Sequence, residues 1–262
     1  MNFSSLIELF TKKPAINHIS NFADCAGQLD ILKLERSYMD LFKEAPKRAE
    51  RGKDYFVGHN GITSSGDDSN RSEEHLAVAL FNATKNGKDF SLDDSQKLSF
   101  LDYQFPLKAR QGDKGIGKVD LFCAIGNSIP AVAELKVPGK NGQLGDTPLK
   151  ALLEGLAYCA IVEANIETIA REAKARFKMN LKTGKPDLIV IAPHEYWSNY
   201  LKKDAAGDWV TPLSKLAEKI KNRLKITTHF LSLRNWEFEM GLSGKPAELK
   251  SNCRIEPVKA LQ

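Results

Sequence analysis

The spacing of hydrophobic residues changes along this chain, and the changes divide it into predicted helices and strands. Residues 29–45 place apolar side chains three or four positions apart, which predicts an amphipathic helix. From about residue 102 the period shortens to that of strands. Helices are predicted over 29–45, from 72 onwards, over 148–178 with one break and over 212–224, and strands over 102–111, 118–125, 131–137, 187–193 and 225–234.

A polar, glycine-rich stretch separates the first helical part from the rest. Residues 58–71, GHNGITSSGDDSNR, have the composition of a loop, and we expect a boundary here between an N-terminal helical segment (1–60) and a main domain with a C-terminal extension (61–262). Ser72 is the expected N-cap of the next helix. Strands alternating with helices after this point predict a mixed α/β fold built around one central sheet flanked by helices.

Composition narrows the class of protein only a little. The chain has 262 residues, of which 42% are apolar and 27% charged, as is typical of a soluble globular protein. A net charge of +5 permits an anionic partner without requiring one. No apolar run approaches the roughly 20 residues of a membrane helix, and the four cysteines are far apart without a CxxC pair. We therefore expect a cytoplasmic protein that does not enter a membrane.

The stretch AVAELKV, residues 131–137, carries two opposite charges inside a strand that is apolar on both faces. Side chains alternate along a strand, so Glu134 and Lys136 share one face with Val132. A strand that is apolar on both faces is typically covered on both sides. The pair is therefore either a structural ion pair or part of a site. The alternative is an edge strand with exposed charges.

Asp120 lies in the preceding predicted strand, fourteen residues before Glu134. Antiparallel neighbours joined by a short turn bring such positions side by side. Two carboxylates suit a hard cation such as Mg²⁺, which activates water and stabilises charge on phosphate oxygens. Lys136 would orient the attacking water or offset the growing negative charge. These residues are chemically sufficient to hydrolyse a phosphodiester.

A glutamate-bearing helix, then GKVDLF, AVAELKV and ALLEGLAYCA, resembles the PD-(D/E)XK nuclease superfamily, which includes restriction endonuclease-like and RecB-like enzymes. The resemblance covers residues 72–193. It implies a restriction endonuclease-like core of αβββαβ order and Mg²⁺-dependent cleavage of DNA, with Mn²⁺ able to substitute. Asp120 and Glu134 fall on the superfamily's metal-ligand positions, and Lys136 falls on its lysine. A homodimer, with one site for each strand of a duplex, is also in keeping with this superfamily.

The resemblance implies further site residues on the neighbouring helices. A glutamate of the first core helix often joins the catalytic and metal-binding set, for which Glu73 is the better match and Glu74 the reserve. Glu154 and Tyr158 resemble a Gln-x-x-x-Tyr pattern that faces the site in several branches. This chain departs from the pattern in having Glu where many relatives have Gln, and Val119 where many have Pro.

Two other classes of function remain open. One is a catalytically silent nucleic-acid-binding or scaffold protein, because one fold hosts many functions. The other is a small-molecule enzyme in which the helix N-terminus at Thr147 binds an anion. Lys114 and Lys118, in a glycine-rich turn, and the cations of residues 169–178 would contact nucleic-acid phosphates or simply form a solvated surface.

Overall fold

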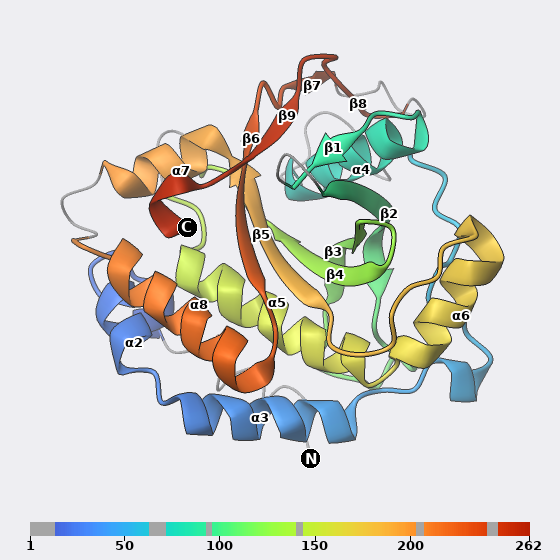
Figure 1. The fold of residues 1–262 in the computed structure, drawn as a ribbon, viewed down its shortest axis with the longest axis horizontal. Helices are drawn as coiled ribbons and strands as arrows, with labels where there is room; N and C mark the ends of the chain where they lie inside the picture. Colours follow the sequence, from blue (N-terminus) through green and yellow to red (C-terminus); the bar gives the residue numbers. More distant parts are fainter. Residues whose placement is uncertain (1–13, 63–71, 93–95, 140–143, 203–206, 240–245) are drawn as a thin grey trace.

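The computed structural model describes residues 14–62, 72–92, 96–139, 144–202, 207–239 and 246–262. A seven-stranded mixed sheet forms its centre, with helices packed on both faces (Figure 1). The strands, in spatial order, are β1 (Phe90–Ser91), β2 (Lys97–Pro106), β3 (Lys118–Ile125), β4 (Ile129–Leu135), β5 (Asp187–Pro193), β6 (Thr228–Arg234) and β9 (Arg254–Pro257). Strands β7 (Phe238–Glu239) and β8 (Glu248–Leu249) pair separately. The α/β class and the mixed sheet expected from the sequence are confirmed.

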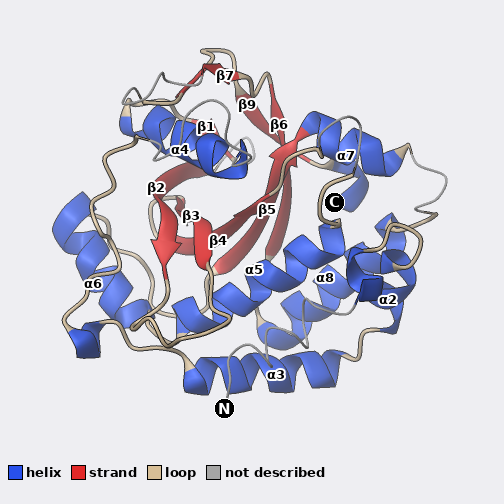
Figure 2. Cartoon of the chain, turned by 180° about the vertical axis from the view of Figure 1, so that it is seen from behind, coloured by secondary structure: helices blue, strands red, loops and turns tan. Residues whose placement is uncertain are grey.

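The helices form two unequal layers. They are α2 (Phe22–Gln28), α3 (Ile31–Glu44), α4 (Ser72–Lys85), α5 (Pro148–Glu163), α6 (Ile166–Phe177), α7 (His194–Leu201) and α8 (Val210–Leu224), with 3₁₀ turns η1 (Pro14–Asn17), η2 (Ala49–Arg51) and η5 (Lys259–Leu261). α5 covers one face of the sheet and α3 packs on α5, while α4 covers the other face (Figure 2). Within the described part of the chain, no helix combines the length and apolar character needed to cross a bilayer.

The sheet is antiparallel at one side and parallel in its middle. β2, β3 and β4 are antiparallel neighbours, whereas β4, β5 and β6 run parallel, and β9 is an antiparallel edge strand. The sheet curls strongly, so that β1 and β9 come into contact although they stand at opposite ends of the strand order. β4 is therefore an interior strand, and the alternative of an exposed edge strand is wrong.

Several predicted boundaries need correction. The strand expected over 102–111 is β2, which begins five residues earlier and ends at Pro106. Residues 107–117 form a loop instead, because the buried carboxylate of Asp113 accepts the backbone N–H groups of Ala109 and Arg110 at 2.9 and 3.0 Å. β4 begins and ends two residues earlier than expected, and Ser72 is the first residue of α4 rather than its N-cap.

Alternation along β4 assigns its side chains to two separate cores. Val132 packs into the core beneath α5, which extends through α3 and α8. Ala131, Ala133 and Leu135 pack into the core beneath α4. Glu134 shares the face of Val132 and therefore points toward α5.

Candidate active site

Asp120 and Glu134 lie opposite each other on β3 and β4, at the start of β3 and the end of β4. The ladder between these strands pairs Leu121 with Ala133, and Asp120 and Glu134 are the next positions on each strand. At this point a side chain of β3, and not its backbone, bonds to β4: the Oδ2 of Asp120 accepts the N–H of Leu135 at 2.9 Å. The fold thus places the two carboxylates side by side, as the sequence predicts.

Lys136 forms a buried ion pair with Glu134. Its Nζ donates to Glu134 Oε1 at 2.8 Å and lies 3.3 Å from Glu154 Oε2 and 3.8 Å from Asp146 Oδ2. Lys136 and Glu134 are only 4% and 5% exposed. The N–H of Lys136 donates to the carbonyl of Ile191, which holds the chain on β5 beyond the end of β4. Glu134 Oε2 is buried without a hydrogen-bond partner among the described residues.

Helix α4 brings Glu73 to the same place from the opposite face of the sheet. Its Oε1 accepts the N–H of Val137 at 3.4 Å, and its charge interacts with those of Lys136 and Asp120. The charge of Glu74 instead acts on Tyr103. Of the two candidates in this first turn, the structure brings Glu73 to the cluster.

Helix α5 presents a ladder of polar side chains spaced four residues apart. Lys150 Nζ donates to Asp146 Oδ2 at 2.7 Å and lies 3.7 Å from Glu154 Oε1. Burial opposes ionisation of Asp146, but the hydrogen bond from Lys150 and the charge of Lys136 hold its pKa below the ordinary value. Sequence reasoning found Glu154 and Tyr158 but missed Asp146 and Lys150. The four-residue spacing was the signal that could have found them.

Two glycines allow α5 and the β2–β3 loop to approach the cluster closely. A Cβ at Gly155 would lie 2.4 Å from Leu188 Cδ1 and 3.5 Å from Glu134 Cβ. A Cβ at Gly117 would lie 2.4 Å from the hydroxyl of Tyr158. Only a residue without a side chain leaves room for these contacts. Tyr158 thus lies between the loop and the cluster.

Gln104 is a further neighbour that sequence reasoning missed. Its Nε2 donates to Asp120 Oδ1 at 3.4 Å, a long hydrogen bond. Gln104 has φ of +46°, in the left-handed region that residues other than glycine rarely adopt, and it follows a register shift between Phe100 and Asp102. Such bulges re-aim side chains near functional sites. No sequence signal distinguishes this glutamine.

Burial and mutual repulsion make three of the carboxylates, those of Glu73, Asp120 and Glu134, hard to ionise. Burial raises the pKa of Glu134 well above its ordinary value, and Lys136 lowers it only in part. Burial likewise raises the pKa of Asp120 to about 7 and raises that of Glu73. Burial alone would lower the pKa of Lys136, but Glu134 and Glu154 outweigh it and hold the pKa well above its usual range. Lys136 therefore keeps its proton.

The donor set fits a small, hard cation. Among the described residues, no group of three or more histidine, cysteine, aspartate or glutamate side chains is arranged to hold a metal ion. Mg²⁺ in proteins commonly binds one or two carboxylates and completes its shell with water and substrate phosphates. Glu134 Oε2, which has no partner among the described residues, and the weakly held Asp120 Oδ1 offer two such oxygens. These two residues would hold the ion.

The helix N-terminus at Thr147 is a poor anion site. The side chain of Thr147 caps α5 by accepting the N–H of Lys150 at 3.2 Å, and its own N–H donates to Asn17 Oδ1 at 2.8 Å. The carboxylate of Asp146 stands immediately before this cap and would repel an anion. These contacts argue against a small-molecule enzyme that binds an anion at this helix.

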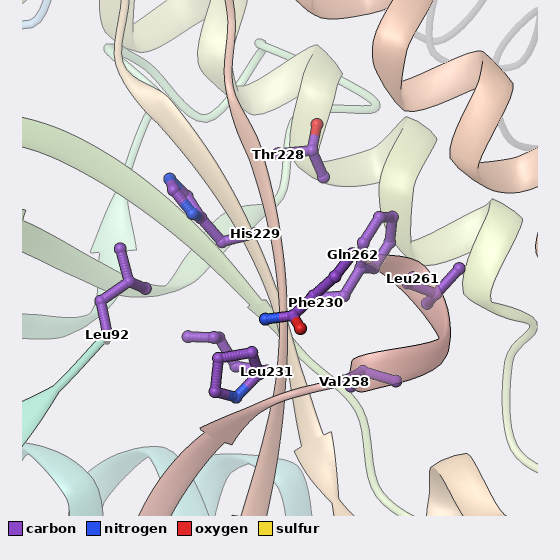
Figure 3. Close-up of a pocket in the computed structure, with 9 residues that line it drawn as sticks. Leu92, Thr228, His229, Phe230, Leu231, Val258, Leu261 and Gln262 are labelled. Carbon is purple, nitrogen blue, oxygen red and sulfur yellow. The ribbon is translucent and has the colours of Figure 1, made fainter. Parts of the chain in front are cut away.

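A pocket lies away from the cluster. This pocket has a volume of about 190 Å³. Figure 3 shows the side chains that line it, which are largely apolar and come mainly from β6 and from the segment that follows β9. Thr228 and His229, which line it, are the first residues of β6, and His229 Nε2 lies 3.0 Å from Asp187 Oδ2 at the start of β5. Glu134 stands near the end of β4, which runs parallel to β5. The pocket is therefore near the starts of the parallel strands, whereas Glu134 is near the end of β4.

Comparisons of the chain with protein-family models, with curated proteins and with solved structures give no match. The resemblance to the PD-(D/E)XK superfamily therefore stays a hypothesis. It rests on the order of the elements and on the residues that the fold brings together around Lys136.

Proposed function

We propose that this chain is a metal-dependent nuclease of the PD-(D/E)XK type that hydrolyses phosphodiester bonds in DNA. The observation that carries the proposal is the arrangement of Asp120 opposite Glu134, with Lys136 Nζ 2.8 Å from Glu134 Oε1. The order α4, β2, β3, β4, α5 and β5, with the two-residue β1 inserted before β2 and α6 before β5, fits the restriction endonuclease-like core that the proposal requires.

Each residue of the cluster has a distinct part in the proposed reaction. Asp120 and Glu134 would hold Mg²⁺, which when bound activates water and stabilises charge on phosphate oxygens. Lys136 is protonated and donates hydrogen bonds, so it stabilises developing negative charge rather than accepting a proton. In the hydrolysis, water oxygen bonds to phosphorus and one ester bond to phosphorus breaks. The water loses a proton and the leaving oxygen gains one.

The surrounding residues keep Lys136 in position. Glu154 and Asp146 lie 3.3 and 3.8 Å from its ammonium group, in addition to Glu134. Both are partly exposed, with side chains 21% and 30% accessible, whereas Glu134 is buried. A phosphate would therefore approach Lys136 from the partly exposed side where Asp146 and Glu154 lie.

The proposal is tested by incubating supercoiled plasmid and single-stranded DNA and RNA oligonucleotides with the purified protein in Mg²⁺, in Mn²⁺ and in EDTA. We expect cutting of DNA that requires a metal ion. Asp120→Asn and Lys136→Met should lower the cutting rate by at least about 100-fold. Asp187→Asn is the matched control. Asp187 is also a half-buried carboxylate on a strand, but it lies at the start of β5, at the opposite end of the strands from Glu134.

Equal cutting by the wild type and both site variants would contradict the assignment of these residues. No cutting by the folded wild type with either metal would contradict the nuclease proposal. In that case DNA binding that persists in EDTA would support the alternative, a catalytically silent nucleic-acid-binding protein. Cutting of RNA alone would contradict DNA as the substrate.

A further inference from the structure

The candidate active site cannot by itself attract a nucleic acid. Five carboxylates gather around only two lysines, and phosphates carry negative charge at every nucleotide. The carboxylates are those of Glu73, Asp120, Glu134, Asp146 and Glu154, and the lysines are Lys136 and Lys150. Affinity for nucleic acid depends mainly on cations that replace the counterions of the phosphates. If the proposed function holds, those cations must lie beside the cluster.

The loop between β2 and β3, with the first residue of β3, supplies such cations. We call residues 107–118 the basic loop. Its four cations, Lys108, Arg110, Lys114 and Lys118, are all exposed, and its one acidic residue is the buried Asp113. Asp113 pairs with Arg110 at 3.2 Å. The three lysine ammonium groups form no ion pair with any residue that the structure describes.

The basic loop is held by contacts from two sides. Arg48 Nη1 donates to the carbonyl of Lys108, and Lys53 Nζ donates to the carbonyl of Ala109 at 2.7 Å. Asp113 ties the loop together through two backbone N–H groups. At its end, Gly117 lies against the hydroxyl of Tyr158. A loop ordered in this way loses little conformational entropy when it binds a ligand.

Lys118 links the basic loop directly to the candidate active site. It is the first residue of β3 and stands two residues before Asp120. The two residues therefore lie about 6.6 Å apart along the strand. A nucleic acid whose scissile phosphate lies at Asp120 would bring a neighbouring phosphate within reach of Lys118.

The basic loop is a better candidate than the cations of α6. Arg176 Nη1 donates to the carbonyl of Phe56 at 2.7 Å, and Lys178 Nζ donates to the carbonyl of Ala175 at 3.3 Å. Both side chains therefore already bind the protein's own backbone. Of the four cations expected there, only Arg171 and Lys174 form neither a hydrogen bond nor an ion pair with the described residues.

We infer that the basic loop binds the sugar-phosphate backbone of the nucleic acid next to the scissile phosphate. Lysine side chains on a loop provide charge to phosphates but carry no sequence information. Binding through this loop is therefore independent of base sequence. The inference rests on the proposed function and adds the surface that holds the substrate.

The test measures binding separately from cutting. Fluorescein-labelled DNA oligonucleotides, single-stranded and duplex, are titrated in EDTA at several KCl concentrations. The loop variant carries Lys108→Gln, Lys114→Gln and Lys118→Gln. The control carries Lys215→Gln, Lys219→Gln and Lys221→Gln, which remove the same charge from the exposed face of α8.

We expect the loop variant to bind at least about tenfold more weakly near 100 mM KCl, with the slope of log Kd against log salt reduced by about 2 to 3. The α8 control should bind within about twofold of the wild type. Two oligonucleotides of unrelated sequence should show the same loss. Wild-type affinity in the loop variant, or a loss confined to one base sequence, would overturn the inference while leaving the nuclease proposal intact.

The two proposals can fail independently. Loop-dependent binding without cutting in any metal would support the inference about the basic loop and contradict the nuclease proposal. Metal-dependent cutting by the loop variant with unchanged KM would support the nuclease proposal and contradict the inference about the basic loop. Absence of DNA binding by the folded wild type would overturn the inference.

Discussion

The buried carboxylate of Asp120 lowers the stability of the folded protein when it is ionised. Burial raises its pKa from an ordinary value near 3.8 to about 7, and Lys136 and the N–H of Leu135 offset this only in part. Because the folded state holds this proton more tightly than the unfolded state, the free energy of unfolding falls as pH rises from about 4 to about 7. Above pH 7 the ionised group destabilises the metal-free protein. Function and stability are therefore in conflict at this residue.

A prediction follows from this dependence of the free energy of unfolding on pH. In EDTA at pH 8, Asp120→Asn should raise the free energy of unfolding by about 2 to 4 kcal/mol, because asparagine keeps the acceptor for Leu135 without the charge. The gain should shrink steadily as pH is lowered toward 4. Urea denaturation of both proteins across this range measures it, with Asp187→Asn as a control that shows no gain. An Asp120→Asn protein less stable than the wild type at pH 8 would contradict the proposed penalty.

At the scale of elements, the site depends on how closely α5 lies over β4 and β5. The helix carries Lys150, Glu154 and Tyr158 at four-residue spacing, so a small shift would move all three relative to Glu134. Gly155 sets this separation, because a Cβ there would lie only 2.4 Å from Leu188 Cδ1. Protein interiors are close-packed and accommodate such an atom only by moving their neighbours.

Gly155→Ala should therefore destabilise the protein by about 1 to 3 kcal/mol, although alanine favours helices, because the added methyl group has no space. It should also lower the cutting rate through displacement of Glu154.

Gly27→Ala is the matched control. Gly27 is also helical, but its added Cβ would meet its nearest neighbour, Pro212 Cβ, at an ordinary 3.8 Å. That change should stabilise the protein by about 0.5 to 1 kcal/mol. Equal effects in thermal denaturation would contradict this account of Gly155.

How far the sequence predicted these elements depended on how distinct each pattern was. β3 and β5 match their predicted bounds because each is a short, strongly apolar run between turn residues. β2 was misplaced, because Asp113 draws residues 107–117 into a loop through contacts that no local pattern encodes. A positive φ at Gln104 is equally invisible in sequence.

The candidate site shows the same division. Asp120 and Glu134 were predictable as neighbours, because strand alternation and a short turn determine their relative placement. Glu154 and Tyr158 entered through resemblance to a family pattern. Asp146 and Lys150 were missed although their spacing was visible, because a four-residue ladder of charges is typical of many solvated helix faces.

At the scale of the whole molecule, the cluster lies where both helical layers and the sheet meet. α4 brings Glu73 in its first turn, and α5 is capped by Thr147 with Asp146 immediately before the cap, so the N-termini of two helices face the same group of carboxylates. The partial positive charge of a helix N-terminus favours anions, which helps to keep several carboxylates together. β3 and β4 contribute the remaining charges from the sheet between the two helices.

A cation that binds this cluster should stabilise the whole protein by mass action. If the dissociation constant for Mg²⁺ is near 1 mM, 10 mM Mg²⁺ should add about 1.4 kcal/mol to the free energy of unfolding, since only the folded state assembles the carboxylates. For a chain of this size we expect a rise in Tm of about 2 to 5 °C. Differential scanning fluorimetry at pH 8, in EDTA and in Mg²⁺, measures the shift. Glu134→Gln should abolish it, because the unpaired Oε2 is lost as a charged ligand, while Asp187→Asn should keep the wild-type shift. A shift of the same size in Glu134→Gln would place the ion elsewhere in the molecule and remove the metal from the proposed site.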